Sequence, residues 1–131
     1  MVDTSAWVEF LRGTGSTLHR TVRSMIGTGA DVAVTEPIVM EVMAGARTER
    51  EAERLREQLL GFTFVRVQGL VDYETAASIQ RVCRQQGQSI RGGVDSLIAA
   101  VAIRSGAELL HGDADFDVIA RHTTLRIAAT A

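Results

Sequence analysis

Short apolar runs rich in β-branched residues alternate with longer amphipathic runs along the whole chain, and this alternation constrains the fold most. It is typical of a parallel α/β sheet, because two parallel strands need a crossover connection, usually a helix, between them. We expect strands at 1–3, 31–35, 62–67, 107–111 and 124–128. Helices are expected between them, at 4–12, 16–26, 36–46, 48–60, 71–87, 93–106 and 116–122.

The size and composition of the chain fit one globular domain. The 131 residues, 46% of them hydrophobic and 23% charged, can build one core, so we expect a single domain over 1–131. No apolar run is long enough to cross a membrane, and the N-terminus lacks the basic start of a signal peptide. Cys83 is the only cysteine, which excludes an internal disulfide and suits a reducing, cytoplasmic location.

The charged residues narrow the classes of function. A net charge of −2 argues against a passive module that coats nucleic acid. All 14 basic residues are arginine, which GC-rich codon usage would also explain. The absence of lysine still excludes chemistry that needs an ammonium group. P-loop nucleotide binding requires a lysine, and so do phosphatases of the haloacid dehalogenase type and response-regulator receivers.

Several acids follow the expected strands. Asp3 closes the first strand, and Asp113, Asp115 and Asp117 crowd behind the fourth. Ligands of parallel α/β sheets bind outside the carboxyl ends of the strands, so Asp3 and Asp113 are expected at the same edge. Taken singly, each of these acids has an alternative role in a turn or as a helix cap.

Two further acids lie within expected helices. Glu41 interrupts the apolar run IVMEVM, where burying an unpaired acid is unfavourable; a partly exposed helix edge is the alternative. Glu41 reaches the edge that holds Asp3 only if its helix crosses above it. Asp95 lies in the first turn of the most apolar helix, where Gly92 and Gly93 let the chain turn. The helix dipole stabilises an acid there by about 0.3–1 kcal/mol, which is the alternative reason for Asp95.

These acids together predict a metal site. Carboxylates gathered at one edge raise each other's pKa by repulsion unless a divalent cation neutralises them. Oxygen ligands from Asp and Glu suit Mg²⁺ or Mn²⁺ and not zinc. We therefore expect one of these two cations among the acids.

Four stretches of the sequence resemble one family. VDTSAWVEFLRG, EPIVMEVMAG, GGVDSLIAAVAI and HGDADFDVIA are similar, in order and spacing, to the PIN-domain nucleases, and most of all to VapC-type toxins of bacterial toxin–antitoxin pairs. The resemblance covers nearly the whole chain and implies a three-layer α/β/α fold with a central, mostly parallel five-stranded sheet. It implies an Mg²⁺- or Mn²⁺-dependent endoribonuclease that hydrolyses RNA phosphodiester bonds. It also implies inhibition by a cognate VapB-type antitoxin and assembly as a homodimer.

The resemblance also assigns roles to the acids. It implies a catalytic set made of Asp3, Glu41, Asp95, Asp113 and the extra acid Asp115. We expect Asp3, Asp95 and Asp113 to hold the main ion, directly or through water. Glu41 and Asp115 are expected to complete a second ion site or to orient the attacking water. The chain departs from the family at its start, because only two residues precede Asp3, so the first strand is expected to be short.

Residues near the acids are candidates for contact with RNA. The hydroxyl of Ser5, in the DTS motif, matches a position that commonly lines the pocket of the family. Arg12 and Arg91 are expected to draw phosphates toward the acids, with ordinary solvated arginines as the alternative. His111 is expected to pack at a strand end rather than act as a base. Trp7 is expected in the core rather than stacked on a base.

A second class of function is weighed against the nuclease. A PIN-fold module without catalysis would act only by binding RNA or a protein partner. The acids present at every expected position argue against it, because an inactive pocket gains stability when it loses like charges.

Overall fold

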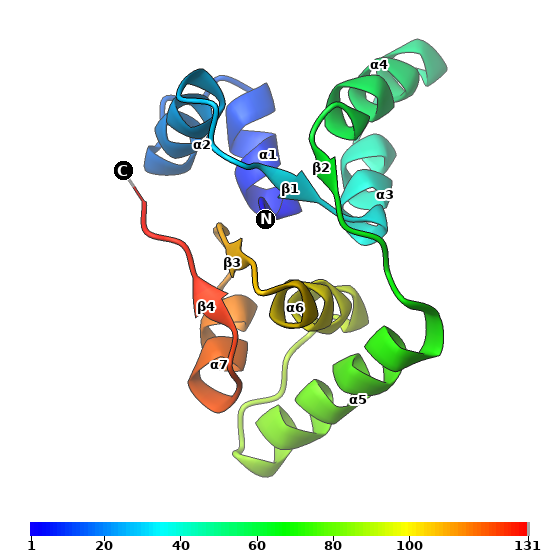
Figure 1. Cartoon of the computed structure of the whole chain (residues 1–131), viewed down its shortest axis with the longest axis vertical. Helices are drawn as coiled ribbons and strands as arrows, with labels where there is room; N and C mark the ends of the chain where they lie inside the picture. The colour runs from blue at the N-terminus through cyan, green and yellow to red at the C-terminus, as the bar shows by residue number, and fades with distance from the viewer. Residues whose placement is uncertain (131) are drawn as a thin grey trace.

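The structure is a computed structural model that describes residues 1–130, in which helices alternate with short strands (Figure 1). The helices are α1 (Thr4–Leu11), α2 (Thr17–Gly27), α3 (Glu36–Ala44), α4 (Glu49–Leu60), α5 (Gly69–Gln85), α6 (Gly93–Ser105) and α7 (Ala114–His122). The strands are β1 (Ala33–Val34), β2 (Thr63–Phe64), β3 (Glu108–Leu109) and β4 (Arg126–Ile127). None of these helices has the length and apolar character that crossing a membrane requires.

The strands pair in parallel. β1 pairs with β2, and β3 pairs with β4. Val2 forms a parallel bridge with Leu110, and its amide donates to the carbonyl oxygen of Ala33 at 3.1 Å, so the N-terminal segment joins the two pairs. The predicted parallel α/β class is confirmed. The continuous five-stranded sheet stays a prediction, because the pairing consists of two two-stranded ladders and one isolated bridge.

The element boundaries differ from those expected at several points; α5, for example, is Gly69–Gln85 instead of 71–87. The strands are two residues long, although each lies within its expected range. α7 begins at Ala114 instead of position 116, because Asp113 caps the helix by accepting a 2.9 Å hydrogen bond from the amide of Asp115. A side-chain oxygen at this position satisfies one of the amides that a helix start leaves unpaired.

Helix α6 lies in the core, as its apolar sequence predicted. The stretch 96–102 is buried throughout. Figure 1 shows α6 in the middle of the molecule, and it packs against α5, α7 and α3. Ser96, Ala99, Ala100 and Ala102 are small enough to let these neighbours approach closely. The buried part of α6 therefore holds the first turn of the helix, which carries Asp95, in a fixed position.

A charged pair joins α5 to α6. Asp72 is 1% exposed and accepts a 2.9 Å hydrogen bond from Nε of Arg104 and a 2.7 Å bond from the amide of Gln68. Arg104 also donates through Nη2 to the carbonyl oxygen of Arg66 at 2.7 Å. The bonds from Arg104 are the main reason why the pKa of Asp72 lies below its ordinary value. The Asp72–Arg104 pair therefore links α5 to the last turn of α6, at the end of the helix opposite Asp95.

The N-terminal helix is anchored by aromatic side chains. Trp7 is 2% exposed, so the prediction that it lies in the core is confirmed. Its ring packs edge-on against Phe10 and tilts against Phe62, with centroid distances of 6.0 and 5.3 Å. This packing fixes α1, whose first turn follows Asp3 directly.

Candidate active site

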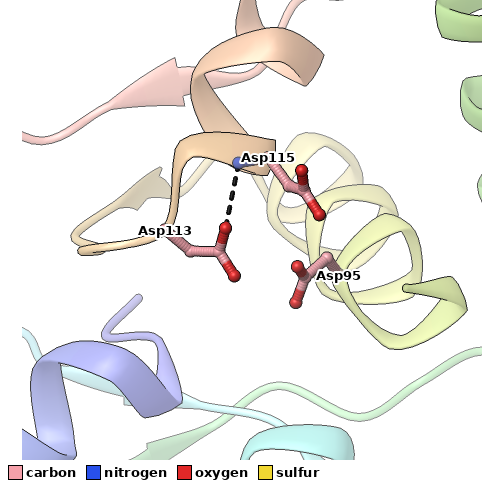
Figure 2. A group of neighbouring side chains, drawn as sticks. All are labelled: Asp95, Asp113 and Asp115. Carbon is pink, nitrogen blue, oxygen red and sulfur yellow. Dashed lines mark hydrogen bonds between the residues drawn. The ribbon is translucent and has the colours of Figure 1, made fainter. Parts of the chain in front are cut away.

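Three aspartates meet at the start of α6 and α7. Asp95, Asp113 and Asp115 each offer a carboxylate oxygen, and these oxygens all lie within 4.8 Å of one another. Figure 2 shows the three side chains pointing toward a common space, Asp95 from the first turn of α6 and the other two from the start of α7. Oxygens at this spacing suit a single hard divalent cation.

The charges of three other acids of the expected set, Asp113, Asp3 and Glu41, act on Asp95. The pKa of Asp95 is raised from its ordinary value of 3.8 to about 7, first by burial and then by the charges of Asp113, Asp3 and Glu41, with a hydrogen bond to Asp113 adding to the effect. Mutual influence of this kind requires the four groups to be close together. The structure therefore brings together the acids of segments that are distant in the sequence.

Glu41 reaches the acids from α3. It is half-buried, and its Oε1 accepts a 2.8 Å hydrogen bond from the hydroxyl of Thr4. The pKa of Glu41 is raised, mainly by burial, with smaller contributions from the charges of Asp3 and Asp113; the bond from Thr4 opposes this. Glu41 is thus partly exposed at the edge of α3, as the alternative held, and it also lies near the other acids. Thr4 was not expected at the site, because a threonine at a helix start reads only as a capping residue.

Asp3 has one oxygen that the protein leaves unpaired. Asp3 is 3% exposed and caps α1 through Oδ2, which accepts from the amide of Ser5 at 3.0 Å and from its hydroxyl at 2.6 Å. Its Oδ1 is buried and has no hydrogen-bond partner among the described residues. A buried acceptor without a partner costs about 1–3 kcal/mol. A bound cation would supply the missing partner, so the residues present fit a divalent metal ion.

Ser5 links the first segment to the end of β3. Its hydroxyl donates to Asp3 and accepts a 2.9 Å hydrogen bond from the amide of Gly112. A Cβ atom on Gly112 would lie 2.7 Å from Cδ1 of Leu18, the end of a flexible side chain, and 3.8 Å from Cβ of Ser5, an ordinary contact distance. The hydroxyl of Ser5 therefore has partners within the protein, and its contact with substrate stays a prediction.

The two candidate arginines lie at different distances from the acids. The amide of Arg91 donates to Oδ2 of Asp115 at 3.1 Å, so this residue adjoins the cluster, and its side chain is exposed. Arg12 caps the far end of α1 from Asp3. At about 1.5 Å per residue, the helix places the two roughly 13 Å apart along its axis. The structure thus brings Arg91 to the acids and leaves Arg12 at a distance.

His111 packs beside the cluster. Its ring tilts against Phe116 with a centroid distance of 5.2 Å, and its Nδ1 accepts a 3.0 Å hydrogen bond from the amide of Asp113. Nε2 lies 3.3 Å from Oδ1 of Asp117 without the geometry of a hydrogen bond. These contacts agree with the expected packing role. Asp117 is largely exposed and is not among the three aspartates that converge.

Comparison with known sequences gives one family. The family model of the PIN domain matches residues 1–122. A VapC ribonuclease of Mycobacterium bovis and ribonuclease VapC11 of Mycobacterium tuberculosis are each 43% identical to this chain over 130 residues, which cover 98% of this chain and 97% of each relative.

Solved structures share the fold at lower identity. VapBC2 from Rickettsia felis, bound to a DNA fragment of its promoter, matches with a TM-score of 0.75 at 16% identity, over 98% of this chain and 96% of that chain. VapC20 of Mycobacterium tuberculosis, a toxin that cleaves the sarcin–ricin loop, matches with a TM-score of 0.67 at 21% identity, over 95% and 97% of the two chains. With three aspartates gathered at the starts of α6 and α7 and its sequence matched over residues 1–122, this chain belongs to the PIN domain family.

Proposed function

We propose that this chain is a metal-dependent endoribonuclease of the VapC type, the toxin of a toxin–antitoxin pair, with residues 1–131 forming one PIN domain. The relatives that are 43% identical are named as VapC ribonucleases. The observation that carries the proposal is the unpaired, buried Oδ1 of Asp3 in a chain whose other acids crowd around Asp95. A three-layer fold around a five-stranded parallel sheet belongs to the same proposal.

The metal ligands are Asp3, Asp95 and Asp113, and the ion is Mg²⁺ or Mn²⁺. Each ligand is held by the fold: Asp3 by Ser5, Asp95 by the buried helix α6, and Asp113 by its cap of α7. When bound, such an ion lowers the pKa of the attacking water and neutralises charge on the phosphate oxygens. Burial and, after it, the charges of Asp113, Asp3 and Glu41 raise the pKa of Asp95 to about 7, and a bound cation would offset the repulsion among these carboxylates.

The other residues orient the water and the substrate. Glu41 is fixed by Thr4 through Oε1, which leaves Oε2 to accept a hydrogen bond from the attacking water. Its raised pKa brings this carboxylate closer to the range in which a general base works near neutral pH. Asp115, which lies near Asp95 and Asp113, completes a second ion site or orients the attacking water. The exposed guanidinium of Arg91 attracts a backbone phosphate toward the acids, and Ser5 and Arg12 are weaker candidates for contact with RNA.

A VapB-type antitoxin is the proposed inhibitor, and a homodimer the proposed assembly. Structures that share the fold are VapBC complexes from Rickettsia felis and Salmonella typhimurium. On this chain, Met40 and Tyr73 are more than half exposed and line an apolar cavity of about 640 Å³ between α3, α5 and α6. Exposed apolar surface of this kind marks protein-binding sites.

Cleavage of RNA with defined metals tests the proposal. Purified protein is incubated with end-labelled RNA in Mg²⁺, Mn²⁺ or EDTA, and we expect cutting with either metal and none in EDTA. Asp95→Asn should reduce the rate of RNA cleavage about 100-fold or more, because a metal ligand is lost. Its circular dichroism spectrum should stay that of the wild type. Asp117→Asn, on the exposed side of α7, is the matched control and should cut at the wild-type rate.

The alternative, a PIN-fold module without catalysis, gives a different result. It binds RNA or a protein partner, and no metal induces cutting. Binding of RNA by the wild-type protein without cleavage in Mg²⁺ or Mn²⁺ would therefore favour the module over the nuclease.

A further inference from the structure

Residues 86–92 connect α5 to α6 and run along α7; we call this segment the strap. The amide of Arg91 donates to Oδ2 of Asp115 at 3.1 Å, in the first turn of α7. Oε1 of Gln88 accepts a 2.6 Å hydrogen bond from Nε2 of His122, the last residue of the same helix. Between these contacts, Ile90 is half-buried against the core. The strap is therefore tied to both ends of α7.

Only one of these ties also belongs to the acidic cluster. Asp115 offers an oxygen within 4.8 Å of oxygens from Asp95 and Asp113, while its Oδ2 holds the amide of Arg91. Without a cation, the neighbouring carboxylates repel Asp115 and weaken its hold on the strap. A divalent cation changes the sign of that interaction and favours the position of Asp115 seen here. The tie through Gln88 and His122 has no such dependence.

We propose that Asp115 couples cation binding to the strap, so that a bound cation fixes the strap against α7 and holds the Arg91 guanidinium beside the acids. The cation itself rests on the proposed function. Coupling of this kind is reciprocal, since a docked strap also holds the negative charge of Asp115 near the cation. Asp115 is then a positioning residue for Arg91. The side chain of Arg91 is exposed and makes no hydrogen bond or ion pair within residues 1–130, which leaves it available to a phosphate.

The rate of tryptic cleavage within the strap measures how firmly the strap is held. The chain contains no lysine, so trypsin cuts it only after arginine, and the bond between Arg91 and Gly92 lies in the strap. The bond between Arg12 and Gly13, at the far end of α1 from Asp3, is the internal reference for any effect of metal on the protease. We expect Mn²⁺ to slow cutting after Arg91 about fivefold or more relative to cutting after Arg12, the lower end of usual coupling strengths.

Three variants separate the charge of Asp115 from its hydrogen bond. Asp115→Asn keeps an oxygen for the Arg91 amide and loses the charge that the neighbouring carboxylates repel, so without metal it should be cut no faster than the wild type, and Mn²⁺ should not slow the cutting. Asp115→Ala loses both and should be cut faster than wild type, with or without Mn²⁺. Gln88→Ala releases only the other tie, so it should be cut faster in both conditions while Mn²⁺ still slows the cutting.

The outcomes distinguish this inference from the nuclease proposal. Slowing by Mn²⁺ that is as strong in Asp115→Asn as in the wild type would overturn the coupling through Asp115. If Mn²⁺ raises the melting temperature and supports RNA cleavage without changing the cutting after Arg91, the inference fails and the nuclease stands. If Mn²⁺ neither stabilises the protein nor supports cleavage, both fail together. Asp115→Asn and Gln88→Ala are mild changes, so the test does not depend on the folding of Asp115→Ala.

Discussion

The hydroxyl of Ser5 donates a 2.6 Å hydrogen bond to Oδ2 of Asp3. The same hydroxyl accepts from the amide of Gly112, so a single oxygen joins the start of α1 to the segment that follows β3. Because Oδ2 is taken by the amide and hydroxyl of Ser5, Oδ1 of Asp3 is the oxygen that remains for a cation. A fixed carboxylate of this kind loses little freedom when it binds an ion.

Ser5→Ala should weaken the binding of Mn²⁺ by about 10–100-fold, the usual effect of losing a group that orients a metal ligand. Isothermal titration calorimetry measures the dissociation constant. Ser5→Thr retains a hydroxyl and should bind close to the wild-type value, and Ser24→Ala, on the exposed face of α2, is the control for serine removal. Equal affinity of Ser5→Ala and the wild type would show that Ser5 does not position Asp3.

In metal-free protein, the free energy of unfolding should fall as the pH rises from about 4 to about 7. The pKa of Asp95 is 3.8 ordinarily and about 7 in the folded protein, so in this window the folded state holds a proton that the unfolded state has lost. Above pH 7 both states are ionised and the dependence on Asp95 ends. Glu41, whose pKa is also raised, acts in the same direction.

Urea unfolding in EDTA at several pH values measures this slope. Asp95→Asn should flatten it, because the amide does not titrate. Stabilisation of the wild type by Mn²⁺ should be larger at pH 7.5 than at pH 5.5, since protons and the ion compete for the same carboxylate. A slope that is identical in wild type and Asp95→Asn would show that this residue does not titrate in the window.

Asp72→Asn should lower the free energy of unfolding at pH 7 by about 2 kcal/mol, since Arg104 loses its charged partner but is itself partly exposed. The pKa of Asp72 lies below its ordinary value of 3.8, so its stabilising effect is present above that pH and is lost as the pH falls further. Wild type and variant should therefore converge in acid. Glu74→Gln, exposed on the same helix, is the control in urea unfolding.

RNA cleavage by Asp72→Asn at a temperature where it stays folded should match the wild type. Asp72 meets Arg104 near the end of α6, roughly 13 Å along the helix from Asp95 at about 1.5 Å per residue. A large loss of activity in the folded variant would mean that the pair influences the acids directly.

The sequence predicted the parts of the site that follow from chain direction. Asp3 and Asp113 come after parallel strands, and the carboxyl ends of such strands share an edge. Asp95 follows a turn at Gly92, and Glu41 interrupts an apolar run, so both were recognised by their unusual surroundings. The parallel α/β class followed from the alternation of elements.

Hydrogen bonds between distant segments of the chain were not predictable from the sequence. Ser5 and Gly112 are 107 positions apart, and no periodic pattern links them. The same holds for the hydrogen bond from Thr4 to Glu41. Arg12 was expected near Asp3 because it is close in sequence, but a helix carries successive residues steadily away from its start.

Binding of Mn²⁺ in the absence of RNA tests the central claim most directly, namely that the acids share a divalent cation. Electron paramagnetic resonance of free Mn²⁺ gives the dissociation constant for the wild type and for Asp3→Asn, Asp95→Asn, Asp113→Asn and the control Asp117→Asn. We predict saturable binding that is about tenfold or more weaker in the three ligand variants and unchanged in the control. Binding that is absent from the wild type, or equal in all five proteins, would contradict the account.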